Sequence, residues 1–266
     1  MLKTRLIPCL LLMNGRLVRS EQFAEHQVIG YPLHEVARFS EWAVDELIYL
    51  DISRPDGDVV GYDIGRDDHK VDDLRSALEI LEHVSRTCFM PLTFGGHIRS
   101  LDDMQVLLAS GADKISVNTA AFDTPDLVTA GSRRFGNQAI VVGIDVLRNT
   151  DGRSEVYVDC GRRSTGLRPQ EWAREVEGLG AGEILLQSID RDGTGAGYDL
   201  ELIGEVSAAV NIPVVALGGV GTYEHLAAAV AAGASAVAAA NIFHFKELSD
   251  RNAKRALQRA GVEVRV

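Results

Sequence analysis

The stretch "MPLTFGGHIRSLDDMQVLLASGADKISVNTAAF" (90–122) contains the unit from which the fold can be predicted. It has a proline, a short apolar run, Gly-Gly, a segment of helical periodicity, Gly-Ala, and a second apolar run that ends in polar residues. The segment "IPVVALGGVGTYEHLAAAVAAGASAVAAANIF" (212–243) repeats this order. Self-similarity on this scale indicates a fold that is built from repeated units. We therefore expect two similar halves, about 1–122 and 123–266.

The rest of the chain continues the same alternation. Short apolar runs rich in Val, Ile and Leu predict strands at 5–12, 46–52, 89–94, 113–118, 139–146, 182–189, 213–217 and 235–240. Helices are predicted near 32–43, 67–85, 101–110, 123–135, 169–179, 200–210, 222–231 and 247–260. Continuous apolar strands that alternate with helices are typical of a parallel sheet covered by helices. Eight such units in 266 residues predict an α/β fold, a single (β/α)8 TIM barrel over 1–266.

Composition excludes several functions. The formal net charge is −11, which argues against nucleic acid as a partner because phosphates attract a basic surface. The three cysteines, Cys9, Cys88 and Cys160, lie far apart and follow no zinc or redox spacing. The histidines show no metal spacing either, so no metal or cofactor is expected.

The apolar run near the N-terminus is short, contains Pro8 and lacks a cleavage site, which differs from a secretory signal. No apolar run is long enough to cross a membrane. We therefore expect a cytoplasmic protein.

Carboxylates at the predicted strand ends are the first candidates for chemistry, because barrel active sites lie where strands run into the following loops. They are Asp51, Asp145, Asp190 and Asp192. Asp145 ends an otherwise apolar strand, and partial desolvation would raise its pKa toward a range useful for acid–base catalysis. The alternative is a structural aspartate that accepts hydrogen bonds from loop amides.

Two Gly-Gly pairs mark possible anion sites. Gly95 and Gly96 follow one predicted strand, and Gly218 and Gly219 follow the corresponding strand of the repeat. In each half the next strand along the chain ends in small or polar residues, which are Asn118 with Thr119 and Ala240 with Asn241. Backbone amides at such positions can bind phosphate, although either pair alone could be a plain turn. The loop 188–199, which includes Asp192 and Gly193, could fold over a ligand or form a surface turn. We expect an extended ligand with two phosphates, or with one diphosphate and another polar end, and we expect Asp51 to contact it.

Charged residues stand at the opposite ends of four strands. These are Arg5, Glu46, Lys114 and Glu183, and their signs alternate around the predicted barrel. Charges on this face usually contribute to stability or are simply solvated. A balanced ring on the barrel axis could instead gate a passage.

Several segments resemble one known family: "RLIPCLLLMNGRLV", "DELIYLDI", "GADKISVNTAAF", "GAGEILLQSIDRDGTGAGYD" and "ANIFHF" are similar to the HisF family, the cyclase subunits of imidazole glycerol phosphate synthase. The resemblance runs from residue 2 to the C-terminus. In that family a glutaminase docks beneath the barrel and releases ammonia, which crosses to a bis-phosphorylated substrate. The resemblance implies a catalytic role for Asp145 and a glutaminase contact at Asp113. It implies an ammonia gate at Arg5, Glu46, Lys114 and Glu183, and phosphate sites at Gly96, Asn118 and Thr119 and at Asp192, Gly193, Gly218, Gly219, Ala240 and Asn241.

The chain also departs from the family. The second catalytic aspartate of the family falls on Leu11, and its nearby lysines fall on Met13 and Arg19. A glycine of the first phosphate loop is His97, and a serine of the second is Leu217. Leucine cannot exchange a proton, and the loss of one member of a catalytic unit typically costs several orders of magnitude in rate.

The start "CLLLMNG" (9–15) resembles a paralogous HisF-like branch associated with amidino sugars of surface polysaccharides. There, ammonia would convert the N-acetyl group of a nucleotide sugar to an acetamidino group. Three hypotheses remain open. The chain is an ammonia-using subunit of this branch that works with a glutaminase, or a histidine-pathway cyclase that tolerates Leu11, or a catalytically weak docking partner that activates the glutaminase. The segment 148–166 resembles the loop that covers the substrate in the family, and its Arg162 and Arg163 could reach phosphate or be solvated.

Overall fold

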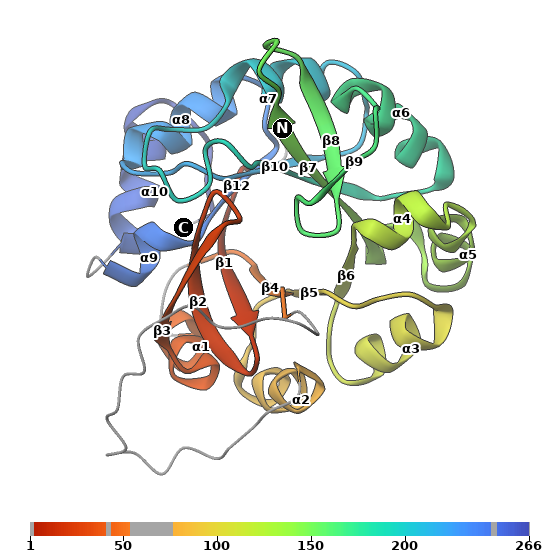
Figure 1. Cartoon of the computed structure of the whole chain (residues 1–266). Helices are drawn as coiled ribbons and strands as arrows, with labels where there is room; N and C mark the ends of the chain where they lie inside the picture. Colours follow the sequence, from red (N-terminus) through yellow and green to blue (C-terminus); the bar gives the residue numbers. More distant parts are fainter. Residues whose placement is uncertain (1–2, 41–43, 54–76, 246–248, 266) are drawn as a thin grey trace.

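The computed structural model describes residues 3–40, 44–53, 77–245 and 249–265 of the chain. Within these residues, eight parallel strands close into a barrel, as the sequence predicted (Figure 1). In spatial order they are β10 (Glu183–Ser188), β11 (Val214–Leu217), β12 (Ala236–Ala239), β1 (Arg5–Met13), β4 (Leu47–Asp51), β5 (Leu92–Gly95), β6 (Lys114–Val117) and β7 (Ile140–Arg148). Pairing of β7 with β10 closes the circle.

Helices lie outside the strands and cover the barrel (Figure 1). They are α1 (Pro32–Ser40), α2 (Ala77–Thr87), α3 (Leu101–Ala109), α4 (Thr119–Asp123), α5 (Asp126–Phe135), α6 (Pro169–Leu179), α7 (Leu200–Ser207), α8 (Tyr223–Ala231), α9 (Asn241–Phe245) and α10 (Ser249–Arg259), with a 3-10 turn, η1 (Asn137–Ala139), before β7. None of the helices in the described ranges is long and apolar enough to cross a membrane.

Most predicted elements are confirmed with small shifts at their ends. The strand predicted at 89–94 begins only at Leu92, because Pro91 has no amide hydrogen for the sheet and Phe89 points into solvent with 93% of its surface exposed. The helix predicted at 123–135 begins at Asp126, and a separate short helix that was not predicted, α4, precedes it. Part of the helix predicted at 67–85 lies outside the described residues, as does 41–43. The division into two half-barrels stays a prediction.

Two β-hairpins rise from the carboxyl ends of the barrel strands. The sequence predicts the second, because the segment 148–166 has two strand-like arms, but it does not predict the first. One is formed by β2 (Arg16–Glu21) and β3 (Glu25–Gly30), which extend β1. The other is formed by β8 (Ser154–Val158) and β9 (Arg163–Ser164), which extend β7. Their tips meet, because a Cβ atom on Gly161 would lie 3.0 Å from the ring of Phe23. The hairpins therefore form a partial roof over this end of the barrel.

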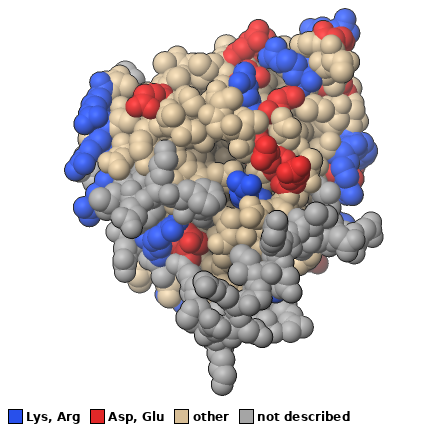
Figure 2. All heavy atoms as spheres, turned by 60° about the vertical axis from the view of Figure 1, so that its left-hand side comes forward, with Lys and Arg blue, Asp and Glu red and all other residues tan. Residues whose placement is uncertain are grey.

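The apolar side chains form two separate clusters, one on each side of the barrel wall. The larger cluster fills the space between the strands and the helices and includes Leu6, Ile140 and Trp172. The smaller lies inside the barrel: Ile7, Cys9, Leu11, Met13, Val18, Ile48, Val141, Leu185, Val215, Leu217, Ala236 and Ala238. Strand residues alternate between these clusters, as the two-residue period of a strand requires. The surface shown in Figure 2 carries cationic and anionic side chains interspersed.

Substitution of Gly182, which directly precedes β10, tests how tightly the barrel wall is packed. A Cβ atom there would lie 2.1 Å from the carbonyl oxygen of Asn137, so a larger residue must displace backbone. We predict that Gly182→Ala lowers the free energy of unfolding in urea by about 1–3 kcal/mol.

The matched control is Gly178 in α6, where an added Cβ would meet no atom within 4 Å. Gly178→Ala should raise the free energy of unfolding by about 0.5–1 kcal/mol, because alanine favours the helix. If Gly182→Ala were as stable as the wild type, the wall would not be rigid at this point.

Candidate active site

A ring of paired charges closes the amino-terminal end of the barrel interior. Arg5 lies at the start of β1, and its guanidinium contacts both Glu46, at 2.9 Å, and Glu183. Lys114 at the start of β6 contacts the same two carboxylates at 3.0 and 3.1 Å. All four side chains are largely buried. The structure thus joins the four charges that the sequence singled out, and each carboxylate lies between two cations.

Burial tends to raise the pKa of Glu46, but hydrogen bonds and charges from Arg5 and Lys114 outweigh it and hold that pKa below its ordinary value. Hydrogen bonds and charges from Glu183, and next from Glu46, raise the pKa of Arg5 against the effect of burial. Two residues of cationic type and two of anionic type make up the ring, so their formal charges balance. Its role as a gate stays a prediction.

Asp113 lies at the same end, directly before β6. Its Oδ2 accepts a hydrogen bond of 2.8 Å from the amide of Leu92. This carboxylate therefore fixes the start of β5, whatever else it contacts.

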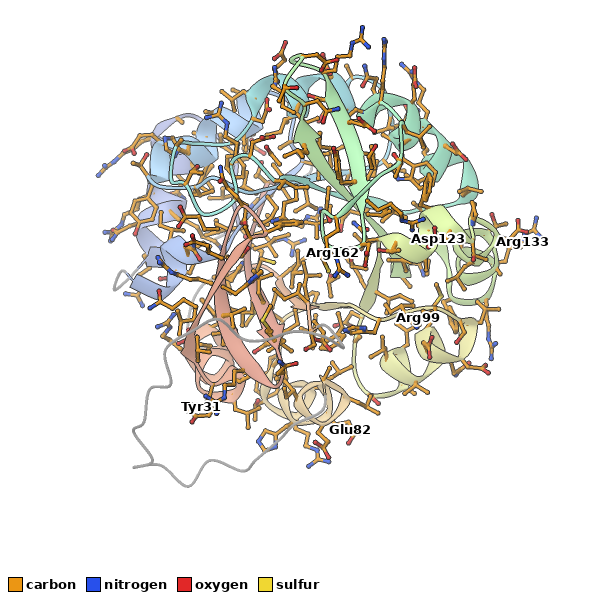
Figure 3. All side chains as sticks on the ribbon, in the orientation of Figure 1. Tyr31, Glu82, Arg99, Asp123, Arg133 and Arg162 are labelled. Carbon is orange, nitrogen blue, oxygen red and sulfur yellow. The ribbon has the colours of Figure 1, made fainter. Side chains whose placement is uncertain are left out.

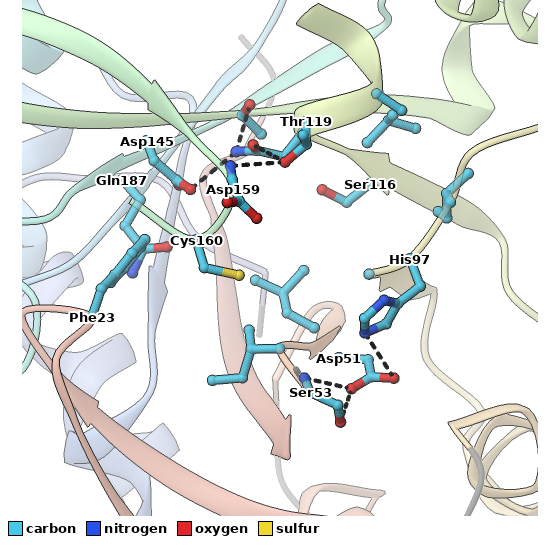
Figure 4. Close-up of a pocket in the computed structure, with 18 of the residues that line it drawn as sticks. Phe23, Asp51, Ser53, His97, Ser116, Thr119, Asp145, Asp159, Cys160 and Gln187 are labelled. Carbon is cyan, nitrogen blue, oxygen red and sulfur yellow. Dashed lines mark hydrogen bonds and ion pairs between the residues drawn. The ribbon is translucent and has the colours of Figure 1, made fainter. Parts of the chain in front are cut away.

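A cavity of about 510 Å³ lies at the opposite end of the barrel. It is bordered by the carboxyl ends of β4, β5, β6 and β7 and by the tips of both hairpins (Figure 4). Charged side chains stand around its rim, among them Arg99, Asp123 and Arg162 (Figure 3). Arg162 pairs with Asp159 at 2.8 Å, and Arg163 pairs with Asp123 rather than pointing at the cavity.

Asp145 faces this cavity from the inner side of β7. Its Oδ2 accepts a hydrogen bond of 3.0 Å from Nδ2 of Asn118, which also binds the carbonyl of Gly143. Burial, and next the negative charge of Asp192, raise the pKa of Asp145 to about 7, although the Asn118 hydrogen bond opposes the shift. A carboxyl group in this state can both donate and accept a proton at neutral pH.

Asp51 lies across the cavity, at the end of β4. Its Oδ1 accepts hydrogen bonds from the amide and the hydroxyl of Ser53, at 3.0 and 2.5 Å. Nε2 of His97 lies 3.8 Å from its Oδ2. Glycine at position 96 lets the loop after β5 approach Asp51 this closely. Its φ is +110°, and a Cβ atom there would lie 2.2 Å from the carbonyl oxygen of Asp51. Gly95 is buried just beneath.

The first predicted anion site borders the cavity. Gly96, Asn118 and Thr119 all line it. The hydroxyl of Thr119 also accepts a 3.0 Å hydrogen bond from the amide of Asp159, which holds the tip of the second hairpin at this point. One wall of the cavity thus combines backbone amides, a carboxamide and a hydroxyl.

The second predicted anion site is placed differently. Gly218, Gly219, Ala240 and Asn241 are not among the described residues that line the cavity. The carbonyl of Gly219 accepts a 2.7 Å hydrogen bond from the amide of Gly197, so the loop after β10 packs directly on it. Among the described residues, this second site therefore does not border the cavity, and its role in binding an anion stays a prediction.

Asp192 and Gly193 anchor the first hairpin. Oδ2 of Asp192 accepts a 2.7 Å hydrogen bond from the hydroxyl of Ser20, and Gly193 packs on the Ser20 carbonyl. Burial raises the pKa of Asp192, although the bond from Ser20 opposes it. Asp190 accepts a hydrogen bond from the amide of Arg148 and so supports the base of the other hairpin.

Sequence reasoning missed several of the lining residues, among them four polar, aromatic or sulfur-containing side chains. Phe23 and Cys160 reach the cavity from the hairpin tips, and Ser116 and Gln187 reach it from barrel strands. Gln187 is the register partner of Asp145, and Ser116 lies two positions before Asn118. The inward alternation of the strands could therefore have identified these two.

The residues that differ from the family pattern also lie at this cavity or beside it. Leu11 lines it while only 6% of its surface is exposed, and both Leu11 and Leu217 belong to the apolar cluster inside the barrel. His97 lines the cavity with 46% of its side chain exposed. One wall is thus apolar where a polar side chain was expected.

Comparison with known proteins agrees with the fold. A family model described as "Histidine biosynthesis protein" matches residues 5–249. The imidazole glycerol phosphate synthase subunit HisF of Caulobacter vibrioides (strain NA1000 / CB15N) is 43% identical over 268 residues, which cover 100% of this chain and 97% of the relative. The similarity therefore extends over both ends of the barrel. The chain belongs to the HisF family of histidine biosynthesis proteins and is an enzyme subunit of that family.

Proposed function

We propose that this chain is the ammonia-using synthase subunit of a complex of the imidazole glycerol phosphate synthase type. Ammonia enters at the amino-terminal end of the barrel and forms a C–N bond in the cavity at the other end. One observation carries this proposal: the charge ring and the Asp145 cavity occupy opposite ends of the same barrel interior.

The residues between the two ends of the barrel interior suit the passage of an uncharged molecule such as ammonia. Cys9, Ala236 and Ala238 are fully buried there, within the apolar inner cluster. An apolar lining excludes ammonium far more strongly than ammonia, because an unpaired charge in such a place costs several kcal/mol (order of magnitude). Lys114 bridges both carboxylates of the ring, so displacement of this one side chain breaks two of the four ion pairs. This supports a role for the ring as a gate.

Asp145 supports the chemistry of C–N bond formation. When ammonia adds to the carbon of a C=O group, the nitrogen must lose protons and the oxygen must gain them before water leaves. A carboxyl group with a pKa of about 7 is present in both protonation states at neutral pH and can serve either transfer.

The first candidate substrate is the bis-phosphorylated intermediate of histidine biosynthesis, from which the complex would make an imidazole ring. The full-length HisF relative supports this candidate. The first anion site, with Gly96, Asn118 and Thr119 on the cavity wall, could hold one of its phosphates.

The second candidate is a nucleotide sugar whose N-acetyl group becomes an acetamidino group. The amide C=O and ammonia give C=NH and water, so the reaction balances without a redox partner. Two observations favour this candidate: Leu11 stands where the ring-closing family has a carboxylate, and Gly218 and Gly219 do not border the cavity. A single diphosphate needs only one of the two anion sites.

Turnover with ammonium chloride as the nitrogen source tests this function. We expect the purified protein to convert one of the two candidate substrates, detected as an imidazole product or as an acetamidino sugar. Asp145→Asn should lower kcat by about 10²–10⁴-fold, because the amide cannot transfer a proton.

Asp151→Asn, a change on the exposed hairpin, is the matched control and should keep the wild-type rate. If Asp145→Asn kept full turnover, the carboxylate would have no catalytic role. If the wild type turned over neither substrate yet stimulated a glutaminase, the chain would be a docking partner only.

The raised pKa of Asp145 also predicts a pH dependence of stability. The unfolded chain releases this proton near pH 4, whereas the folded chain holds it to about pH 7. Between these values the folded state binds more protons, so this group lowers the free energy of unfolding as the pH rises. We predict that Asp145→Asn gains stability relative to the wild type from pH 4 to pH 7, by on the order of 2–4 kcal/mol in urea denaturation. A constant difference across this range would contradict the shifted pKa.

The expected partner is a glutaminase that forms a heterodimer by docking at the end of the barrel that carries the charge ring. Phe89 precedes β5 at this end, and 93% of its surface is exposed. An exposed aromatic ring is a common anchor in protein interfaces. The predicted cytoplasmic location accompanies this proposal.

We predict that Phe89→Ser weakens binding to the glutaminase by about 30-fold, measured by calorimetry, because an aromatic anchor contributes on the order of 2 kcal/mol. Turnover with ammonium chloride should not change. Val106→Ser on α3 removes another exposed apolar side chain and is the control. If both variants bound the glutaminase equally well, Phe89 would lie outside the interface.

A further inference from the structure

His97 stands in an unusual backbone conformation at the wall of the cavity. It follows Gly96 after β5, and its φ is +57°, in the left-handed region that costs a residue with a side chain on the order of 1 kcal/mol. Strain of this kind is retained mainly where the surrounding structure or the function requires it. The imidazole is half exposed and borders the cavity.

The carboxylate of Asp51 lies beside this imidazole. Its Oδ2 lies 3.8 Å from Nε2 of His97, while both donors of Ser53 fix its Oδ1. The close approach of Gly96 to the Asp51 carbonyl places the loop directly over the carboxylate. A carboxylate beside one ring nitrogen orients the ring and leaves the other nitrogen, Nδ1, to serve the cavity.

The position of the pair completes the chemistry of the cavity. Figure 4 shows His97 and Asp51 on one side and Asp145 on the other. Leu11 pairs with Leu50 in the neighbouring strand, directly before Asp51, and neither leucine can move a proton. The His97–Asp51 pair thus places an imidazole and a carboxyl group across the cavity from Asp145, Asp51 one strand and His97 two strands away from Leu11.

We propose that His97, oriented by Asp51, is a second catalytic residue that works opposite Asp145. This inference rests on the proposed function. Ammonia forms a bond to the carbon of the substrate C=O group, and the π electron pair of that group moves to oxygen. His97 accepts a proton from the new ammonium nitrogen, and protonated Asp145 gives one to the oxygen. The two side chains then return to their first states by proton exchange with solvent. A second transfer in the same directions expels water and leaves C=N, and a second exchange with solvent resets both side chains.

Replacement by glycine separates a catalytic role from a structural one. His97→Gly relieves the left-handed strain, so its melting temperature should equal or exceed that of the wild type. We expect kcat with saturating ammonium chloride to fall about 100-fold, with little change in the KM of the substrate. Free imidazole should restore the rate at least ~10-fold, with saturation, because it can occupy the vacated space and accept the proton.

His97→Asn is the conservative variant, since asparagine also tolerates a left-handed φ and keeps a hydrogen-bonding group. It should be as stable and as slow as His97→Gly, and imidazole should rescue it less. His83→Gln on α2, which does not border the cavity, should keep the wild-type rate.

Four results would overturn the inference. The first is a wild-type rate in His97→Gly, and the second is a slow His97→Gly variant that imidazole does not rescue. The third is a rise in KM at constant kcat, which indicates a role in binding alone. The fourth is a rate loss that merely follows a lower melting temperature. A wild type that converts neither substrate would instead overturn the proposed function, and the role of His97 with it.

Discussion

Closure of the parallel sheet is the constraint on which both ends of this protein depend. Because β7 pairs with β10 and β1 with β12, alternate side chains of these strands enter one enclosed space. A charge in such a space is stable only if it is paired or keeps its proton. At the amino-terminal end the charges pair with one another. At the other end burial, and next the charge of Asp192, raise the pKa of Asp145 to about 7, although a hydrogen bond from the neutral side chain of Asn118 opposes the shift.

The features that could be predicted from sequence are those that a single strand determines. Each apolar run marked a barrel strand, and the residue at its end faces the mouth whatever the neighbouring strands are. Asp145 could be assigned to the cavity for this reason. Arg5, Glu46, Lys114 and Glu183 could be assigned to one face because each stands at the start of a strand. The direction in which parallel strands run then brings these four together without further information.

The features that could not be predicted depend on contacts between distant segments. The turn of the first hairpin is Gln22-Phe23, and both residues have a positive φ although neither is glycine or asparagine. The carbonyl of Asp192 binds the amide of Gln22, and the Asp192 carboxylate accepts from Ser20. Likewise, Gly219 resembles Gly96 in sequence context, but the loop that contains Gly197 packs against it. The local sequences around the two Gly-Gly pairs are similar, and the loops above them decide which pair borders the cavity.

Leucine at position 11 has a consequence for Asp145 beyond the loss of a second acid. The charge of Asp192 already raises the pKa of Asp145, and a further carboxylate across the mouth would act in the same direction. Two such groups would share a proton and titrate as a pair. Leu11 instead extends the apolar inner cluster up to the cavity and adds no charge there. Asp145, with a pKa of about 7, can exchange its proton near neutral pH, and the imidazole of His97 takes the proton-accepting role that a second aspartate would have.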